Sequence, residues 1–222
     1  HTYLHQCGRM LTTATTGGSV EILGTRVALT DQAQVDASGE QGGGQILVGG
    51  DYQGKNANIQ NAQVTYVGKD TQLKASATHT GAGGKVIVWS DDTTRAYGNI
   101  EAKGGTNAGN GGFIETSGKR YLDVAGIKVD TRAADGSAGW WLLDPTDITI
   151  THSLTPVNAS LTVTGDTSTI ADIDIFNAID TTNVSISTVS AGAGTGNITV
   201  YGSADSGGAA VISNQSGFER TL

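Results

Sequence analysis

Short alternating segments, each preceded by a glycine, recur along the chain. They are Gly18–Ile22, Gly44–Val48, Gly84–Val88, Gly112–Thr116 and Gly139–Leu143. Apolar and other residues alternate in most of them, which predicts strands with one face turned toward a core. The first inward positions, separated by 26, 40, 28 and 27 residues, are Val20, Ile46, Val86, Ile114 and Trp141. A repeat of this length is typical of a solenoid, a propeller or another repeat array.

Two further sets of short segments follow the same spacing. The second set comprises Thr25–Leu29, Thr94–Tyr97 and Arg120–Val124. The third set comprises Gln34–Ala37, Gln72–Ala75, Asn99–Ala102 and Gly126–Val129. Three sets in step predict a coil with three sides. The pattern therefore predicts an all-β fold, a parallel β-helix solenoid with three short strands per coil of about 27 residues.

The alternation also predicts which side chains point inward. The predicted core positions are Val20, Ile22, Ile46, Val48, Val86, Val88, Ile114, Trp141 and Leu143. Glu21, Lys85 and Glu115 alternate with them and are expected to face water. A propeller is the weaker alternative, because it needs tight antiparallel hairpins and the Asn-Gly and Asp-Gly pairs that mark them are scarce.

In the third set, the residues expected to stack are Val35, Leu73, Ile100 and Ile127. Residues 1–150 are predicted to form regular coils. The long gap between Ile46 and Val86 predicts an extra loop or side hairpin near residues 51–70, standing off the stack. Alternation within Ala57–Val67 predicts an added strand in that loop.

Residues 151–222 are predicted to continue the solenoid less regularly. Strands are expected at Leu161–Thr164 and Val184–Ser187. A short helix is expected at about residues 170–179, covering an end or a side of the solenoid. Ser168 or Thr169 would cap this helix, with Asp172 as a capping-box partner.

Composition narrows the classes of function. The chain has 222 residues with 33 Gly, 2 Pro and a net charge of -8. Nucleic acid is not expected as a partner, because the acidic chain lacks a basic stripe. Membrane insertion is not expected, because no apolar stretch reaches the length of a span. A single cysteine, Cys7, and four scattered histidines predict no metal site and no cofactor.

A resemblance to a known family comes from three segments. Trp140–Ile150, which contains the block Trp-Leu-Leu-Asp-Pro, follows Gly83–Trp89 and Gly111–Gly118. Together they resemble the filamentous haemagglutinin and high-molecular-weight adhesin family of two-partner secretion exoproteins. The similarity is clearest over residues 80–205. It implies a right-handed β-helix shaft, secreted by a Gram-negative bacterium through an outer-membrane transporter and displayed on the cell surface.

The resemblance also implies adhesion, with a host-cell glycan or protein receptor as partner. One feature departs from the family: its N-terminal secretion domain carries Asn-Pro-Asn motifs, whereas the prolines here are Pro145 and Pro156. The chain is therefore expected to be a shaft segment of a longer exoprotein, downstream of the secretion signal. The transporter would then be a partner of the full-length protein and not of this fragment.

Two outward features carry the candidate chemistry. Trp140 should point away from the core, where an exposed indole could stack on a glycan, whereas Trp141 should fill the core. The alternative function is a carbohydrate-active β-helix, a polysaccharide lyase or hydrolase that uses Glu115, Asp91 and Asp92. Such an enzyme needs carboxylates grouped roughly 5 to 10 Å apart in a groove. Scattered carboxylates are what any acidic solenoid displays, so the chain is not expected to be an enzyme.

Overall fold

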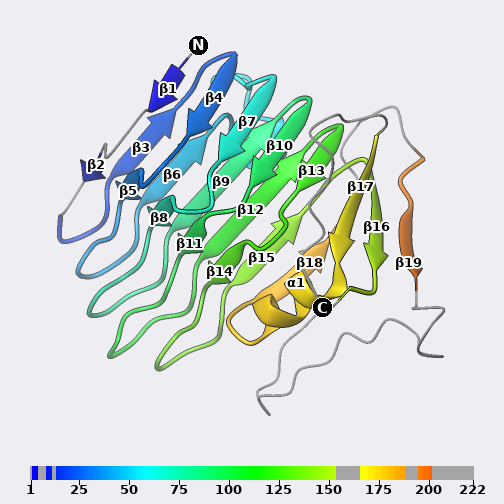
Figure 1. The fold of residues 1–222 in the computed structure, drawn as a ribbon. Helices are drawn as coiled ribbons and strands as arrows, with labels where there is room; N and C mark the ends of the chain where they lie inside the picture. The colour runs from blue at the N-terminus through cyan, green and yellow to red at the C-terminus, as the bar shows by residue number, and fades with distance from the viewer. Residues whose placement is uncertain (1, 5–8, 12–13, 154–165, 189–194, 202–222) are drawn as a thin grey trace.

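The computed structural model describes residues 2–4, 9–11, 14–153, 166–188 and 195–201. Its strands lie side by side in successive coils, from the blue N-terminal strands to the yellow ones in Figure 1. Every strand pair formed in this part of the chain is parallel. The prediction of an all-β parallel solenoid is confirmed.

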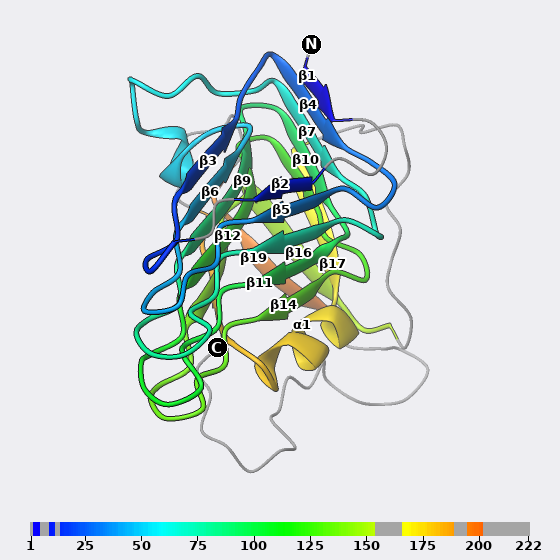
Figure 2. The ribbon, with the colours of Figure 1, turned by 90° about the vertical axis from the view of Figure 1, so that its left-hand side faces the viewer.

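Three sheets form the walls of the solenoid, and Figure 2 looks along the stack into the space between them. In spatial order, the first sheet contains β3 (Ser19–Ile22), β6 (Gln45–Val48), β9 (Lys85–Ser90), β12 (Phe113–Gly118), β15 (Trp140–Leu143) and β18 (Asn183–Ile186). The second contains β1 (Thr2–Leu4), β4 (Arg26–Leu29), β7 (Val64–Val67), β10 (Thr93–Ala96) and β13 (Tyr121–Asp123). The third contains β2 (Arg9–Leu11), β5 (Gln34–Asp36), β8 (Gln72–Lys74), β11 (Asn99–Glu101) and β14 (Lys128–Asp130).

The register of the first sheet stacks equivalent residues of successive coils. Along the stack, the paired residues are Val20, Ile46, Val86, Ile114, Trp141 and Val184. All nine predicted core residues of this sheet are buried in one apolar cluster. Trp141 is fully buried and its indole Nε1–H donates a hydrogen bond of 2.9 Å to Thr116 Oγ1. This bond satisfies the polar end of the indole inside the core.

The third sheet differs from the prediction at its last strand. Ile100 pairs with Val129, not with Ile127. The residues between β13 and β14 form a turn in which the Ile127 N–H bonds to the Val124 carbonyl and Gly126 takes a φ of 73°. This turn uses two residues that the expected spacing assigned to the strand, so the register moves by two positions.

A smaller sheet follows the regular coils, with the order β17 (Thr167–Ala171), β16 (Asp147–Thr151) and β19 (Ile198–Tyr201). Its strand β17 packs against β13, where the Leu122 N–H donates to Ser168 Oγ at 2.9 Å. The spatial order along the stack is therefore β13, β17, β16. The chain first forms β16, one strand further along the stack, and then forms β17 in the place between β13 and β16. The predicted strand Leu161–Thr164 lies outside the described residues, and the one predicted at Val184–Ser187 corresponds to β18.

The helix α1 spans Asp172–Ile179 and begins later than expected. Its N-cap is Ala171, which makes no side-chain capping bond, because Ser168 and Thr169 belong to β17. Asp172 does not serve in a capping box; its carboxylate accepts the Ser153 N–H at 2.9 Å. The expected capping residues are therefore wrong.

The helix lies at the edge of the third sheet, next to β14 (Figure 2). The Thr181 hydroxyl, just after α1, donates to the Val129 carbonyl at 2.5 Å, and the Thr131 N–H donates to the Thr181 carbonyl at 3.0 Å. The segment thus satisfies backbone groups at the edge of the sheet. Within the described residues, no helix is long and apolar enough to cross a membrane.

Candidate functional site

A segment between β6 and β7 covers the outer face of the first sheet. We call residues 49–63 the strap; it contains the short 3-10 helix η1 (Tyr52–Gly54). Figure 2 shows η1 in cyan beside the first sheet, and η1 packs against β9. The extra loop was expected to stand off the stack and to carry a strand over Ala57–Val67. The first expectation is wrong, because the strap lies on the sheet. The second is confirmed only for Val64–Val67, which forms a strand of the second sheet.

The strap buries an apolar patch that points away from the core. Leu47, Ile87 and Trp89 are at most 2% exposed and form a cluster separate from the main core. Gly54 lies flat on the Trp89 ring, since a Cβ at this glycine would come within 2.5 Å of the indole nitrogen. The edge of the Tyr52 ring meets the Phe113 ring, with 5.8 Å between their centroids. The strap therefore has its own apolar contacts with the sheet.

The sequence carries a signal for this cover. Ile46–Val48 and Val86–Trp89 are continuous apolar runs. In a sheet with one solvent-exposed face, apolar and polar residues should instead alternate along each strand. Such runs are typical of strands that are buried on both faces. Leu47, Ile87 and Trp89 could therefore have been recognised as covered positions, but the segment that covers them could not have been identified from the runs themselves.

Hydrogen bonds close a ring between the strap and the sheet. The Gln53 backbone N–H donates to both Glu115 carboxylate oxygens at 3.2 Å, and Gln53 Nε2 donates to Asp144 Oδ2 at 2.6 Å. The Asp144 N–H donates to Ser117 Oγ at 3.1 Å. The Ser117 side chain in turn bonds to Glu115. One strap residue thus joins the carboxylates of two adjacent coils.

Glu115 does not face water as predicted; it is fully buried beneath the strap. Burial is the main cause that raises its pKa, to about 7, and the negative charges of Asp144 and Asp51 act in the same direction. The bonds from Ser117 and from the Gln53 N–H oppose the shift. The result is a carboxyl group that titrates near neutral pH.

Asp51 holds the beginning of the strap. Burial raises its pKa, but hydrogen bonds from the Asn56 amide and the Tyr52 N–H, together with Lys85, keep the pKa below its usual range. Lys85 Nζ lies 3.1 Å from Asp51 Oδ1 and comes from β9. Asp51 is therefore an ionised anchor, in contrast to Glu115.

The other carboxylates of the alternative enzyme site have separate partners. Asp91 Oδ1 accepts hydrogen bonds from Asn61 Nδ2 at 3.1 Å and from Trp89 Nε1 at 3.3 Å, whereas Asp92 forms an ion pair with Arg120. The carboxylates whose charges raise the Glu115 pKa are those of Asp144 and Asp51. Within the described residues, no group of three or more His, Cys, Asp or Glu side chains is placed to hold a metal ion.

The second candidate feature, Trp140, is 41% exposed. It pairs across strands with Phe113, so two aromatic side chains stand next to each other on the outer face. An open groove of about 750 Å³ passes this pair, lined by the glycines that precede the strands and by Ser19, Gln45, Lys85, Phe113 and Trp140. The groove runs along the stack, because its lining comes from successive coils.

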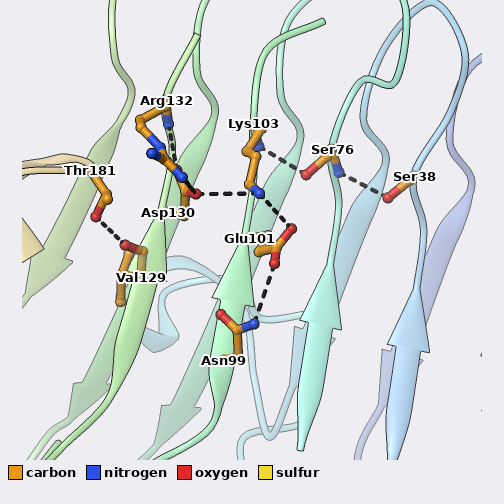
Figure 3. Close-up of polar contacts among 9 residues, drawn as sticks. All are labelled: Ser38, Ser76, Asn99, Glu101, Lys103, Val129, Asp130, Arg132 and Thr181. Carbon is orange, nitrogen blue, oxygen red and sulfur yellow. Dashed lines mark hydrogen bonds and ion pairs between the residues drawn. The ribbon is translucent and has the colours of Figure 1, made fainter. Parts of the chain in front are cut away.

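The third sheet carries a polar network of a different kind (Figure 3). Lys103 Nζ lies 3.1 Å from Glu101 Oε2 and 3.3 Å from Asp130 Oδ2, and Arg132 pairs with Asp130 at 2.6 Å. The Lys103 N–H donates to Ser76 Oγ at 3.0 Å. The contacts of Lys103 with Asp130 and Ser76 join successive coils, whereas Glu101 and Arg132 pair within one coil, so the charges of this network have partners inside the sheet.

Comparisons with known proteins add a likeness to solved structures. No family model matches the chain, and no curated protein matches it. The chain is similar to the crystal structure of the HMW1 secretion domain from Haemophilus influenzae, with 34% sequence identity and a TM-score of 0.47. The match covers 58% of this chain and 32% of that one. The solenoid itself is established by its own strand pairing.

Proposed function

We propose that this chain is a structural and adhesive shaft segment of a large secreted surface exoprotein, similar to filamentous haemagglutinin. The observation that carries the proposal is the unbroken stack of parallel coils around one apolar core. Each added coil lengthens such a stack by one strand spacing, about 4.8 Å, and buries the face of its neighbour. A stack of this kind is suited to hold a binding surface at a distance.

The sequence resemblance supplies the setting of the proposal. The Trp-Leu-Leu-Asp-Pro block within Trp140–Ile150 and the preceding Gly-Gly strands support membership of the two-partner secretion exoproteins. The shaft would be right-handed, as parallel crossover connections almost always are. The full-length protein would be secreted by a Gram-negative bacterium through an outer-membrane transporter, and this segment would lie downstream of the secretion signal at the cell surface.

The adhesive part of the proposal rests on Trp140 and Phe113. The exposed Trp140 ring, beside the half-buried Phe113, offers a flat apolar face, and neighbouring polar side chains in the same groove can bond to hydroxyl groups. Gln45 and Ser19 line the groove beside them. A host glycan that runs along the stack is the receptor class that this arrangement fits best.

Binding of the purified chain to an array of host glycans and matrix proteins tests the adhesive role. We expect binding by the wild type, loss of binding in Trp140→Ala, and retained binding in Tyr66→Ala. The control residue Tyr66 is a similarly exposed aromatic residue on the second sheet. No binding by a wild type whose circular dichroism shows the β-fold would reduce the proposal to a spacer.

The proposal assigns no catalysis to this chain. Incubation with acidic and neutral polysaccharides, followed by measurement of new reducing ends and of unsaturated products, should show no cleavage. Cleavage that disappears in Asp91→Asn or Asp92→Asn would favour the alternative, a lyase or hydrolase.

A further inference from the structure

One of the groups that fasten the strap to the sheet, Glu115, is buried and titrates near neutral pH. Most of the strap's remaining contacts do not change with pH near neutrality: Gly54 packs on Trp89, Tyr52 meets Phe113, and Asn61 Nδ2 donates to the Gly54 carbonyl at 3.0 Å. Glu115 is different, because the strap both bonds to it and removes it from water. The protonation state of Glu115 is therefore coupled to the position of the strap.

Gln53 makes this contact in an unfavourable backbone conformation. It has φ 52° and ψ 22°, in the left-handed region that a non-glycine residue rarely occupies. In this conformation its N–H points at Glu115 while its side chain reaches Asp144. Backbone strain at one residue that joins two carboxylates is typical of a segment with a switching role.

Each element packed on Glu115 brings a charged or titratable group close to its carboxyl group. Asp51 from the strap and Asp144 after β15 are negative, and the Tyr52 phenol from η1 has a raised pKa and stays neutral. The nearby cations are engaged elsewhere: Lys85 of β9 pairs with Asp51, and Lys55 Nζ donates to Gln53 Oε1 at 2.6 Å. Among the described residues, no ion pair is formed with Glu115.

We propose that the strap is a proton-controlled lid, which closes on the first sheet when Glu115 is protonated and loosens when Glu115 ionises. Ionisation places a third negative charge near Asp144 and Asp51 at a position that the strap buries from solvent. Opening returns water to the Glu115 carboxylate. It also uncovers the apolar patch of Leu47, Ile87 and Trp89.

The direction follows from proton linkage. With the strap closed, the pKa of Glu115 is about 7, and with the strap open it returns toward its usual value near 4.5. The closed form therefore binds the proton more tightly, so closure is favoured at low pH and this advantage is lost as the pH rises through 7. Between pH 8 and pH 5, the ratio of closed to open strap should rise on the order of 10²-fold.

Hydrogen exchange of the strap measures this ratio. Peptides covering residues 49–63 would be followed by mass spectrometry from pH 5 to pH 8.5, with correction for the intrinsic pH dependence of exchange. In the wild type we expect protection of the strap to fall at least tenfold across this range. In Glu115→Gln, which keeps an acceptor for the Gln53 N–H but cannot ionise, protection should not depend on pH.

Asp92→Asn is the matched control, because the half-exposed Asp92 carboxylate pairs with Arg120, and the hydrogen bond from this residue to the strap is made by its backbone N–H, which donates to the Gln63 carbonyl at 3.1 Å and is kept in the variant. It should retain the wild-type pH dependence. Equal strap protection at pH 5 and pH 8.5 in the wild type would overturn the proposal, as would an unchanged pH dependence in Glu115→Gln.

A second measurement needs no substitution. The side-chain carboxyl carbon of Glu115 can be titrated by NMR in the wild-type chain. We expect a midpoint near 7, accompanied by a change in the Gln53 amide signal over the same range. A midpoint at the usual value for glutamate, or a Gln53 signal that does not follow the titration, would contradict a lid controlled by Glu115.

Discussion

Neighbouring glycines have different roles in this chain. A Cβ at Gly43 would lie 2.0 Å from the Ala75 carbonyl oxygen and 2.3 Å from the Gly84 nitrogen, so only glycine fits between the coils at this position. At Gly42 the nearest atom is the Thr16 methyl carbon at 3.6 Å, which is ordinary contact. Glycine is thus required at position 43 because two backbones approach closely there, whereas the packing at position 42 does not require glycine.

We predict that Gly43→Ala destabilises the chain by about 3 kcal/mol or more, because the contacts are with backbone that cannot move aside. Gly42→Ala should change the free energy of unfolding by less than about 1 kcal/mol. Denaturant titration of the two variants, monitored by circular dichroism, measures the difference. Similar losses of stability in both would show that the spacing of the coils adapts to an added methyl group.

Among the elements, α1 stands out because a buried carboxyl group holds it. Asp174 Oδ1 accepts the Gly126 N–H at 3.0 Å, while Oδ2 is buried and has no hydrogen-bond partner among the residues that the structure describes. Burial raises the Asp174 pKa to about 6, and the charge of Asp123 adds to the shift. The bond to Gly126 favours the ionised form but does not outweigh burial. The contact between α1 and the turn after β13 is therefore sensitive to pH.

A carboxyl group whose pKa is raised on folding stabilises the folded state fully below its unfolded pKa, near 3.8, and this stabilisation is lost as the pH rises through about 6. Asp174→Asn should therefore be more stable than the wild type at pH 7, by up to about 3 kcal/mol, and similar to it at pH 4. Thermal unfolding at the two pH values tests this. Greater stability of the wild type at pH 7 would contradict the prediction.

On the scale of the whole molecule, each coil contacts mainly its two neighbours. Val86 of β9 pairs with Ile46 on one side and with Ile114 on the other, and all three are fully buried. A defect at this position acts on the coils at both sides, because neither can bury its apolar face without the coil between them.

We predict that Val86→Asp destabilises the fold by several kcal/mol, because it buries a carboxylate without a partner. Gln45→Asp, on an outward position of the adjacent strand, should be tolerated. Hydrogen exchange should show protection lost first in β6, β9 and β12, with β16 and β17 less affected. A uniform loss across all strands would instead indicate that the solenoid unfolds as a single unit.

The regular features of the fold could be predicted from the sequence. The spacing of Val20, Ile46, Val86 and Ile114 predicted the stack, because the side-chain alternation of a strand and the length of a coil are both local properties of the chain. Burial of Trp141 and exposure of Trp140 follow from the same alternation. The one register error, Ile127 in place of Val129, arose where a turn consumed two extra residues.

The sequence by itself thus determined the coils and their inward faces, and the tertiary structure decided the site. Glu115 was expected in water because alternation defines only which side of the sheet a residue occupies. Whether that side is exposed to solvent depends on residues 49–63, of which Gln53 contacts Glu115 from 62 positions away along the chain. The place of β17 between β13 and β16 has the same origin. Both depend on contacts between distant segments, which a local pattern does not encode.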